Sequence, residues 1–300
     1  LLFLLVIVIQ PQVFGQKAET IQFARSFFLS HHPDIENPDA FQFDQLTHYG
    51  HVWIFETTQS PSFILVKEED RPQLAGYSFE NSFHQHGQVS EALQYALEKI
   101  EESDLSQYKG PSRLKSYPES VEPILASKWD QNKVTNYFCP EDTAGTGGRA
   151  YTGCVAVAMG QIVRHYNHWN TFFFESSYNA GKYGILTDNV GGYNWAKMED
   201  RPICESLEVS RLLYHMGLVT RMGYSGGSSS TSNFNAYAAF KDLGYLSVGR
   251  MLKAFTDTSK WVSNFYRNIS ESKPLFVTGW GHAYVCDGYD SRGFFHFNLG

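Results

Sequence analysis

The chain is poor in cysteine, with four such residues among 300. No two of them form a Cys-x-x-Cys pair, so the sequence gives no sign of a redox dithiol or of a zinc site built on paired cysteines. A disulfide within the set Cys139, Cys204 and Cys286 stays open for an exported protein. Core packing is the favoured role of Cys286, because this residue lies in an apolar run.

Metal-ligand patterns are missing as well. The eleven histidines do not stand with cysteine or carboxylate at zinc-ligand spacing. His165 and His168 could meet on one helix face, but a complete site needs at least three protein ligands. We therefore predict no metal ion and no other cofactor.

Positive charge is scarce and dispersed. The chain has 24 Lys and Arg against 31 Asp and Glu, a net charge of −7, and its basic residues form no cluster. Because proteins bind nucleic acids largely by neutralising phosphates, we predict no nucleic-acid partner. The 16% aromatic content indicates a compact enzyme, since disordered chains are poor in aromatic residues.

One long apolar run occurs, at residues 1–9, and it is too short to span a bilayer. With Val13, Phe14 and Gly15 it reads as the apolar region and cleavage site of a signal peptide, residues 1–15, whose basic start is lost. The alternative is a buried strand. Gln16 stands where a lipoprotein would have cysteine. We expect a secreted protein, cut short at both ends, with no membrane partner after signal cleavage.

The most informative segment surrounds Cys154. Gly153 breaks the chain before it, and Ala158, Ile162 and Tyr166 follow at four-residue spacing, which predicts a buried helix that begins at the cysteine. The positive end of the helix dipole favours a thiolate there, and the thiolate is the nucleophilic form. Taken alone, the segment is equally compatible with a small core residue.

A second segment supplies the groups that a catalytic thiol needs. His282 stands between Gly281 and Ala283 at the start of an apolar strand, and Asn298 ends another strand-like run 16 positions later. A thiol needs a base, and the base needs a partner that orients it. The chain order Cys154, His282, Asn298 is that of papain-like proteases. A histidine that opens an apolar strand is, by itself, more often structural.

Several stretches together carry a resemblance to a known family. They are Thr152-Gly-Cys-Val-Ala156 with Gln161-Ile162, Tyr193-Asn-Trp195, Gly281-His-Ala-Tyr-Val-Cys-Asp-Gly-Tyr289 and Phe295-His-Phe-Asn298, after a lead-in that includes Val121-Glu-Pro-Ile-Leu125 and Asn136-Tyr-Phe-Cys-Pro140. The chain resembles the streptopain family of secreted bacterial cysteine proteases, which have a papain-like fold. The resemblance extends over residues 18–300 and is strongest from residue 121 onward.

The resemblance implies a role for each matched catalytic position. Cys154 matches the nucleophile of the family. His282 matches the general base, which later protonates the leaving amine. Asn298 matches the residue that orients the histidine.

Other matched positions concern the substrate. Trp195 matches a tryptophan near the substrate cleft, and Gly226 and Ser228 lie in a Gly/Ser-rich loop that matches a border of the specificity pocket. Leu299 departs from the family, which usually has a tryptophan there that shields the His–Asn pair. Thr278 stands where streptopain has a glutamine of the oxyanion hole. The backbone N–H of the nucleophile remains as the other oxyanion donor.

The first third of the chain reads as a separate unit. Apolar spacing predicts helices at residues 21–29 and 91–102 around strands at 52–55, 62–66 and 74–77. This unit resembles the family's propeptide, so residues 16–115 are assigned to an inhibitory propeptide that ends in a polar linker open to a protease.

Residues 116–300 are assigned to the catalytic domain, with its C-terminus missing. Apolar spacing predicts helices at residues 207–216, 235–243 and 261–269 and strands at 275–277 and 283–286. The fold class expected is α+β: a papain-like domain, with a helix-led subdomain and an antiparallel sheet subdomain, preceded by a small α+β propeptide.

These inferences lead to the zymogen of a secreted cysteine endopeptidase. Its partners would be protein or peptide substrates and its own propeptide. The alternative is a catalytically weak or inactive homologue that acts as a binding or inhibitory module, which Leu299 and Thr278 motivate. A third candidate, a Cys–His hydrolase or acyltransferase acting on cell-wall amides, is disfavoured by the lead-in and by the propeptide-like unit.

Overall fold

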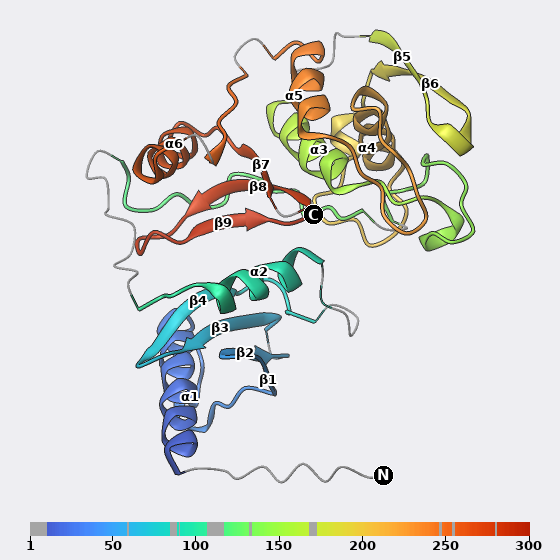
Figure 1. Cartoon of the computed structure of the whole chain (residues 1–300). Helices are drawn as coiled ribbons and strands as arrows, with labels where there is room; N and C mark the ends of the chain where they lie inside the picture. The colour runs from blue at the N-terminus through green and yellow to red at the C-terminus, as the bar shows by residue number, and fades with distance from the viewer. Residues whose placement is uncertain are drawn as a thin grey trace. The chain divides into compact units, whose positions relative to one another are not determined.

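The computed structural model describes residues 11–58, 60–84, 89, 91–106, 117–131, 134–167, 173–245, 248–253, 256–279 and 281–300. Contacts divide the chain into two compact units, Leu1–Gly110 and Pro111–Gly300 (Figure 1). Each unit contains helices and antiparallel strands, so the expected α+β class is confirmed. No helix within the described ranges is long and apolar enough to cross a membrane.

The first unit is a four-stranded antiparallel sheet between two helices. β1 (Gln45–Tyr49), β2 (Val52–Thr57), β3 (Ser62–Glu68) and β4 (Pro72–Ser78) pair in chain order. α1 (Pro11–His31), which a short η1 (Pro38–Ala40) follows, packs on one face of the sheet, and α2 (Glu91–Glu102) packs on the other (Figure 1). The predicted helices and strands of this unit are thus present.

Burial on both faces explains the unbroken apolar run in β3. Ile64 and Val66 belong to the cluster under α1, whereas Phe63 and Leu65 belong to the cluster under α2. Successive side chains of a strand point to opposite faces, so a sheet covered on both sides needs apolar residues at consecutive positions. β1 escaped prediction because its five residues are mostly polar and none of them is buried.

The helix α1 is longer at its start than the predicted one. It begins at Pro11, inside the stretch assigned to the end of the signal peptide. Residues 1–10, which contain the apolar run, lie outside the described residues. The signal peptide therefore stays a prediction.

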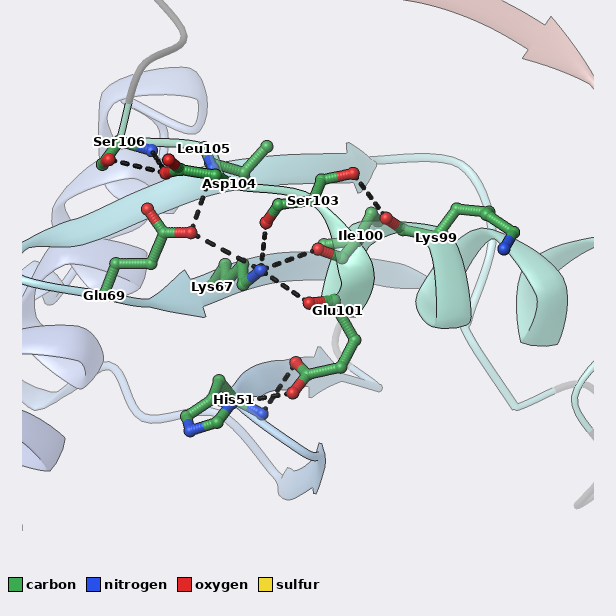
Figure 2. A network of polar contacts seen from close by, with 10 residues as sticks. All are labelled: His51, Lys67, Glu69, Lys99, Ile100, Glu101, Ser103, Asp104, Leu105 and Ser106. Atoms are coloured by element: carbon green, nitrogen blue, oxygen red, sulfur yellow. Dashed lines mark hydrogen bonds and ion pairs between the residues drawn. The ribbon is translucent and has the colours of Figure 1, made fainter.

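A buried lysine ties the last turn of α2 to β3. Nζ of Lys67 donates to the carbonyl oxygens of Ile100 at 3.0 Å, Glu101 at 2.8 Å, and Ser103, and lies 3.5 Å from Oε1 of Glu69 (Figure 2). The last carbonyls of a helix have no partner within the helix, and an ammonium group offers three donors. Lys67 therefore caps α2 from the neighbouring strand.

The second unit is built around α3 (Cys154–Tyr166). This helix packs between α4 (Leu207–Val219) and a three-stranded antiparallel sheet of β7 (Leu275–Gly279), β8 (His282–Tyr289) and β9 (Phe295–Asn298). α5 (Asn233–Asp242) contacts α4, and α6 (Thr258–Ser270) packs on the sheet (Figure 1). The predicted helices and strands of this unit are present, and most of them are longer than predicted.

β8 is the central strand of this sheet and is buried on both faces. Ala283 and Val285 belong to the core around α3, whereas Cys286 and Tyr289 belong to the cluster around α6. The sheet thus holds the start of β8 against the helix that begins at Cys154. The core-packing role expected for Cys286 agrees with its complete burial.

A hairpin in this unit escaped prediction. β5 (Phe173–Asn179) and β6 (Ile185–Gly191) pair along their whole length and are joined through η3 (Gly181–Tyr183). Most of their described side chains are at least partly exposed, so no apolar alternation marks the strands. Two further short helices are η2 (Thr146–Gly148) and η4 (Trp195–Lys197).

The lead-in stretch is part of the second unit. Val121 exchanges two backbone hydrogen bonds of 2.9 Å with Tyr289, and the Ile124 N–H donates to the Asp287 carbonyl at 2.9 Å. The buried carboxylate of Asp287 accepts from the Leu125 N–H at 2.9 Å. The segment 121–125 is therefore tied to β8 and belongs structurally to the domain that contains Cys154.

Candidate active site

Cys154 is the first residue of α3 and follows a glycine with a special conformation. Gly153 has a φ of +91°, and a Cβ atom at this position would lie 2.8 Å from Cε of Met222 and 3.0 Å from the carbonyl oxygen of Ser229. Only glycine adopts this backbone conformation readily at such close quarters. The half-buried thiol is thereby placed at the N-terminus of the helix, as the sequence predicts.

His282 opens β8 and is hydrogen-bonded to the thiol of Cys154. The turn before it contains Gly281 with a φ of +83°. On the other side of the ring, Nε2 lies 2.7 Å from the carbonyl oxygen of Leu299. Because a carbonyl only accepts, Nε2 carries a proton, which leaves Nδ1 to face the sulfur.

The surroundings of Cys154 favour its thiolate. Burial raises the pKa of the thiol, but the hydrogen bond and the charge of His282 act against burial, as do the backbone N–H groups of Ala283 and Val155. The net result is a pKa below the ordinary value of a cysteine. A half-buried thiol with a lowered pKa is the usual form of a reactive cysteine.

The other three cysteines are free thiols as well, so the disulfide left open by the sequence is not formed. Burial raises the pKa of Cys139 to about 12 and that of Cys286 well above its usual range. Neither buried thiol is a candidate nucleophile. Cys204 is exposed and lies outside the regular elements.

Asn298 enters the site by a different route from the one expected. Its Nδ2 donates to the Ser127 carbonyl and to Oε1 of Gln161, both at 2.8 Å. Its Oδ1 accepts from Nε2 of Gln161 at 3.2 Å. The resemblance places the Asn298 amide at the far nitrogen of His282, whereas in the structure the backbone carbonyl of Leu299 bonds that nitrogen. Asn298 therefore reaches the ring through the next residue.

Sequence reasoning assigned no role to Ser127 or Gln161. A signal for Gln161 exists: it is the one amide in the apolar stretch of α3, and it follows Cys154 by seven positions, two helical turns, on the same face. Ser127 gives no comparable signal, because its part in the network depends on a contact 34 positions away in the chain.

The Gly/Ser-rich loop lies against the segment that leads into α3. The Tyr151 N–H donates to the Ser225 carbonyl at 3.1 Å, and the Gly226 N–H donates to Oδ2 of Asp142 at 3.0 Å. Gly226 is buried and Ser228 is exposed. The structure thus brings the loop next to the segment that leads into α3, and its role as a wall of the substrate cleft stays a prediction.

Asp142 anchors this loop and was missed by sequence reasoning. Besides the Gly226 N–H, its Oδ2 accepts from the Tyr183 hydroxyl and from Nζ of Lys182 at 2.9 Å. These bonds, that of Tyr183 first, hold the pKa of the Asp142 carboxyl well below its usual range. One carboxylate therefore joins the tip of the β5–β6 hairpin to the loop.

Replacing Asp142 with asparagine should raise KM for peptide substrates with little change in kcat. The variant keeps the size of the side chain but loses a charged acceptor, so the loop is held less firmly, while the reacting groups stay in place. Steady-state kinetics on a peptide series would measure this. Glu175→Gln is the matched control, because the Glu175 carboxylate bonds Thr187 within the same hairpin. Equal KM values for both variants would contradict an anchoring role.

Comparison with known proteins agrees with this geometry. The sequence profile of the Peptidase C10 family matches residues 129–300, more than half of the chain. The chain belongs to the Peptidase C10 family. The resemblance to streptopain and the expectation of a cysteine-type peptidase are thereby confirmed.

Individual relatives support the same assignment. The thiol protease/hemagglutinin PrtT of Porphyromonas gingivalis is 28% identical over 283 residues, which cover 83% of this chain and 32% of PrtT. Streptopain of Streptococcus pyogenes is 26% identical over 273 residues, which cover 79% of this chain and 68% of streptopain. The chain thus spans about a third of the length of PrtT and two thirds of that of streptopain.

Solved structures show the same fold. A prointerpain A fragment of Prevotella intermedia superposes with a TM-score of 0.73 at 22% identity, over 86% of this chain and 88% of that one. Active interpain A cysteine protease from the same organism superposes with a TM-score of 0.56 at 23% identity, over 66% of this chain and 85% of that one. The papain-like α+β fold predicted from the sequence is confirmed.

Thr278, the candidate for the oxyanion hole, lies in β7, next to the strand β8 that contacts the thiol. It is half-buried and pairs with Ala283. The backbone N–H of Ala283 bonds the sulfur of Cys154. Thr278 is thus near the reacting groups, and its role as a donor stays a prediction.

Trp195 lies toward the other end of α3. In the same stretch, the Met198 carbonyl accepts from Arg164 at 2.9 Å, and Trp195 lines an open hollow of about 710 Å³ together with Asn167. Asn167 is the C-cap of α3, about 20 Å along the helix from Cys154 at 1.5 Å per residue. Trp195 thus lies toward the C-terminal end of α3, and its place near the substrate cleft stays a prediction.

The described residues contain no candidate metal site. Within those ranges, no group of three or more His, Cys, Asp or Glu side chains could hold an ion. His165 lies in the last turn of α3. His168, with which it was considered as a pair, lies outside the described residues.

Proposed function

We propose that the chain is the zymogen of a secreted cysteine endopeptidase that hydrolyses peptide bonds of proteins with Cys154 and His282. The observation that carries this proposal is the hydrogen bond between the thiol and the imidazole at the start of α3. Membership of the Peptidase C10 family supports it, as do relatives named as thiol or cysteine proteases. Export rests on the apolar run at residues 1–9.

The proposed reaction is acyl transfer to the thiol. Transfer of the Cys154 proton to Nδ1 of His282 gives a thiolate–imidazolium pair. The sulfur attacks the peptide carbonyl carbon, and the oxygen takes up the electron pair and faces the N–H of Cys154 at the helix start, with Thr278 as the proposed second donor. The C–N bond then breaks as Nδ1–H protonates the departing amine. Water attacks the thioester, gives a proton to Nδ1, and releases the acid with the thiol restored.

The first unit is proposed to be the inhibitory propeptide. It has its own core on each face of its sheet, so it can fold as a unit. Because residues 121–125 are bonded to β8, an activating cut that leaves the second unit intact belongs before Val121. The polar linker between the units is the site that we propose for this cut, and its residues 107–116 lie outside the described residues.

A binding or inhibitory module with little turnover is the second candidate. It is favoured by the bond between His282 and a backbone carbonyl in place of the Asn298 amide. The family's shielding tryptophan is also absent, with Leu299 in that position. A neutral thiol at Cys154 in solution would support this candidate against the protease.

The proposed function can be tested with a peptide epoxide, which alkylates active-site thiolates. We expect it to modify Cys154, located by mass spectrometry, once the linker has been cleaved. Cys204, which is exposed, serves as the internal control and should stay unmodified at the same dose. The His282→Ala variant should lose most of the labelling. Equal labelling of Cys204 and Cys154 would contradict the proposal.

A further inference from the structure

A buried amide network lies behind the nucleophile on α3. Gln161 is fully buried, and its Oε1 accepts from the Ser127 hydroxyl at 3.1 Å and from the Asn298 amide at 2.8 Å. Its Nε2 donates back to Oδ1 of Asn298 at 3.2 Å. With the bond to the Ser127 carbonyl, both protons of the Asn298 amide are used. The two side chains are thus joined by reciprocal hydrogen bonds in a buried site.

This network fixes the course of the chain after β9. Asn298 meets Gln161, two turns into α3, and a Cβ atom on Gly300 would lie 3.2 Å from Cγ1 of Val157, only one turn into the helix. The chain therefore runs back along α3 toward its N-terminus. Leu299 lies between the two contacts, and its carbonyl meets the ring of His282.

We infer that Gln161 is a positioning residue of the active site, which holds Asn298 so that the backbone carbonyl of Leu299 orients the His282 ring toward Cys154. The inference rests on the proposed function, because it assumes that the thiol and the imidazole act as a pair. In this arrangement Asn298 acts through the backbone carbonyl of Leu299. Gln161, on the same helix as Cys154, helps to align the ring of His282.

The physical reason is that a carbonyl can orient the imidazole only if its own peptide is fixed. A polar side chain in a buried site keeps one arrangement when all its donors and acceptors are satisfied, and a half-satisfied network moves. Without Gln161, one proton and one lone pair of the Asn298 amide lose their partner. The 298–300 segment can then shift, and the bond between Leu299 and His282 weakens with it.

The test is the pH dependence of Cys154 alkylation by iodoacetamide in the full chain, followed by mass spectrometry of the cysteine peptides. In the wild type, alkylation should persist to a lower pH at Cys154 than at Cys204. In Gln161→Met, which keeps the length but removes the amide, the midpoint at Cys154 should rise by about one pH unit, so that alkylation at pH 6 falls roughly tenfold. The midpoint at Cys204 in the same molecules should not move.

Two further variants keep the inference falsifiable. Val163→Ala opens a cavity in the same buried helix and controls for loss of stability; it should lower the melting temperature without moving the Cys154 midpoint. Ser127→Ala removes a single hydrogen bond to Gln161 and should raise the Cys154 midpoint by a smaller amount. This variant tests the inference if Gln161→Met does not fold.

The results distinguish a failure of the positioning role of Gln161 from a failure of the proposed protease function. The positioning role is overturned if the Cys154 midpoint is low in the wild type and stays unchanged in folded Gln161→Met. If Gln161→Met does not fold, an unchanged midpoint in Ser127→Ala overturns it. Either result leaves the proposed protease function intact. Equal midpoints at Cys154 and Cys204 in the wild type remove the proposed pair, and the inference with it.

Discussion

Replacing Cys154 with serine should abolish hydrolysis of casein and of peptide substrates, with kcat/KM reduced on the order of a thousandfold or more. The hydroxyl of serine is far less acidic than a thiol, so His282 cannot hold it as an anion at neutral pH. The favourable surroundings of position 154 stabilise a thiolate and give a neutral hydroxyl little help. Assays after cleavage of the linker would measure the loss.

The fold should survive this change, because serine is close to cysteine in size and Cys154 is only half-buried. A thermal unfolding curve close to that of the wild type would show it. Cys204→Ser is the matched control: it removes an exposed thiol outside the regular elements and should leave activity unchanged. Retained proteolysis in Cys154→Ser, or its loss in Cys204→Ser, would refute the assignment of the nucleophile.

The candidate catalytic groups could be located from the sequence because each of them stands at the end of a regular element. Cys154 follows a glycine and precedes an apolar helical pattern, and His282 opens an apolar strand. Their pairing needed the family resemblance, since 128 positions separate them and no periodicity relates a helix start to a strand start. The structure supplies that contact through the packing of α3 on β8.

The residues that support the candidate site could not be predicted from the sequence, for a physical reason. Gln161, Ser127 and Asp142 act through hydrogen bonds to residues 34 to 171 positions away, and such bonds leave no local pattern. The Leu299 carbonyl belongs to the backbone, so the identity of the side chain carries no trace of its role. Trp195 was found by its motif alone, and its position at the hollow that Asn167 also lines depends on contacts that the local sequence does not show.

In the first unit, Lys67→Met should destabilise the fold by about 3 kcal/mol, because it leaves three part-buried carbonyl oxygens and a carboxylate without their donor. The Lys67 side chain is 8% exposed and carries the bonds to the carbonyls of Ile100, Glu101 and Ser103 (Figure 2). Methionine has a similar length but offers no donor. Loss of the Lys67 ammonium group also leaves the Glu69 carboxylate, which is 15% exposed, without a nearby positive charge.

The expected readout is local, at the end of α2 and in the strands beneath it. Hydrogen exchange in the full chain should speed up for amides of α2 and β3 and stay unchanged for those of α3, and the melting transition of the first unit should fall by roughly 10–20 °C. Lys99→Met is the matched control, since Lys99 lies on the same helix, is 37% exposed and pairs with Glu102 at its surface. The control should behave as the wild type. Equal exchange in both variants would mean that the helix end is held by apolar packing against Leu65 and Phe83, and that the ammonium group of Lys67 is dispensable.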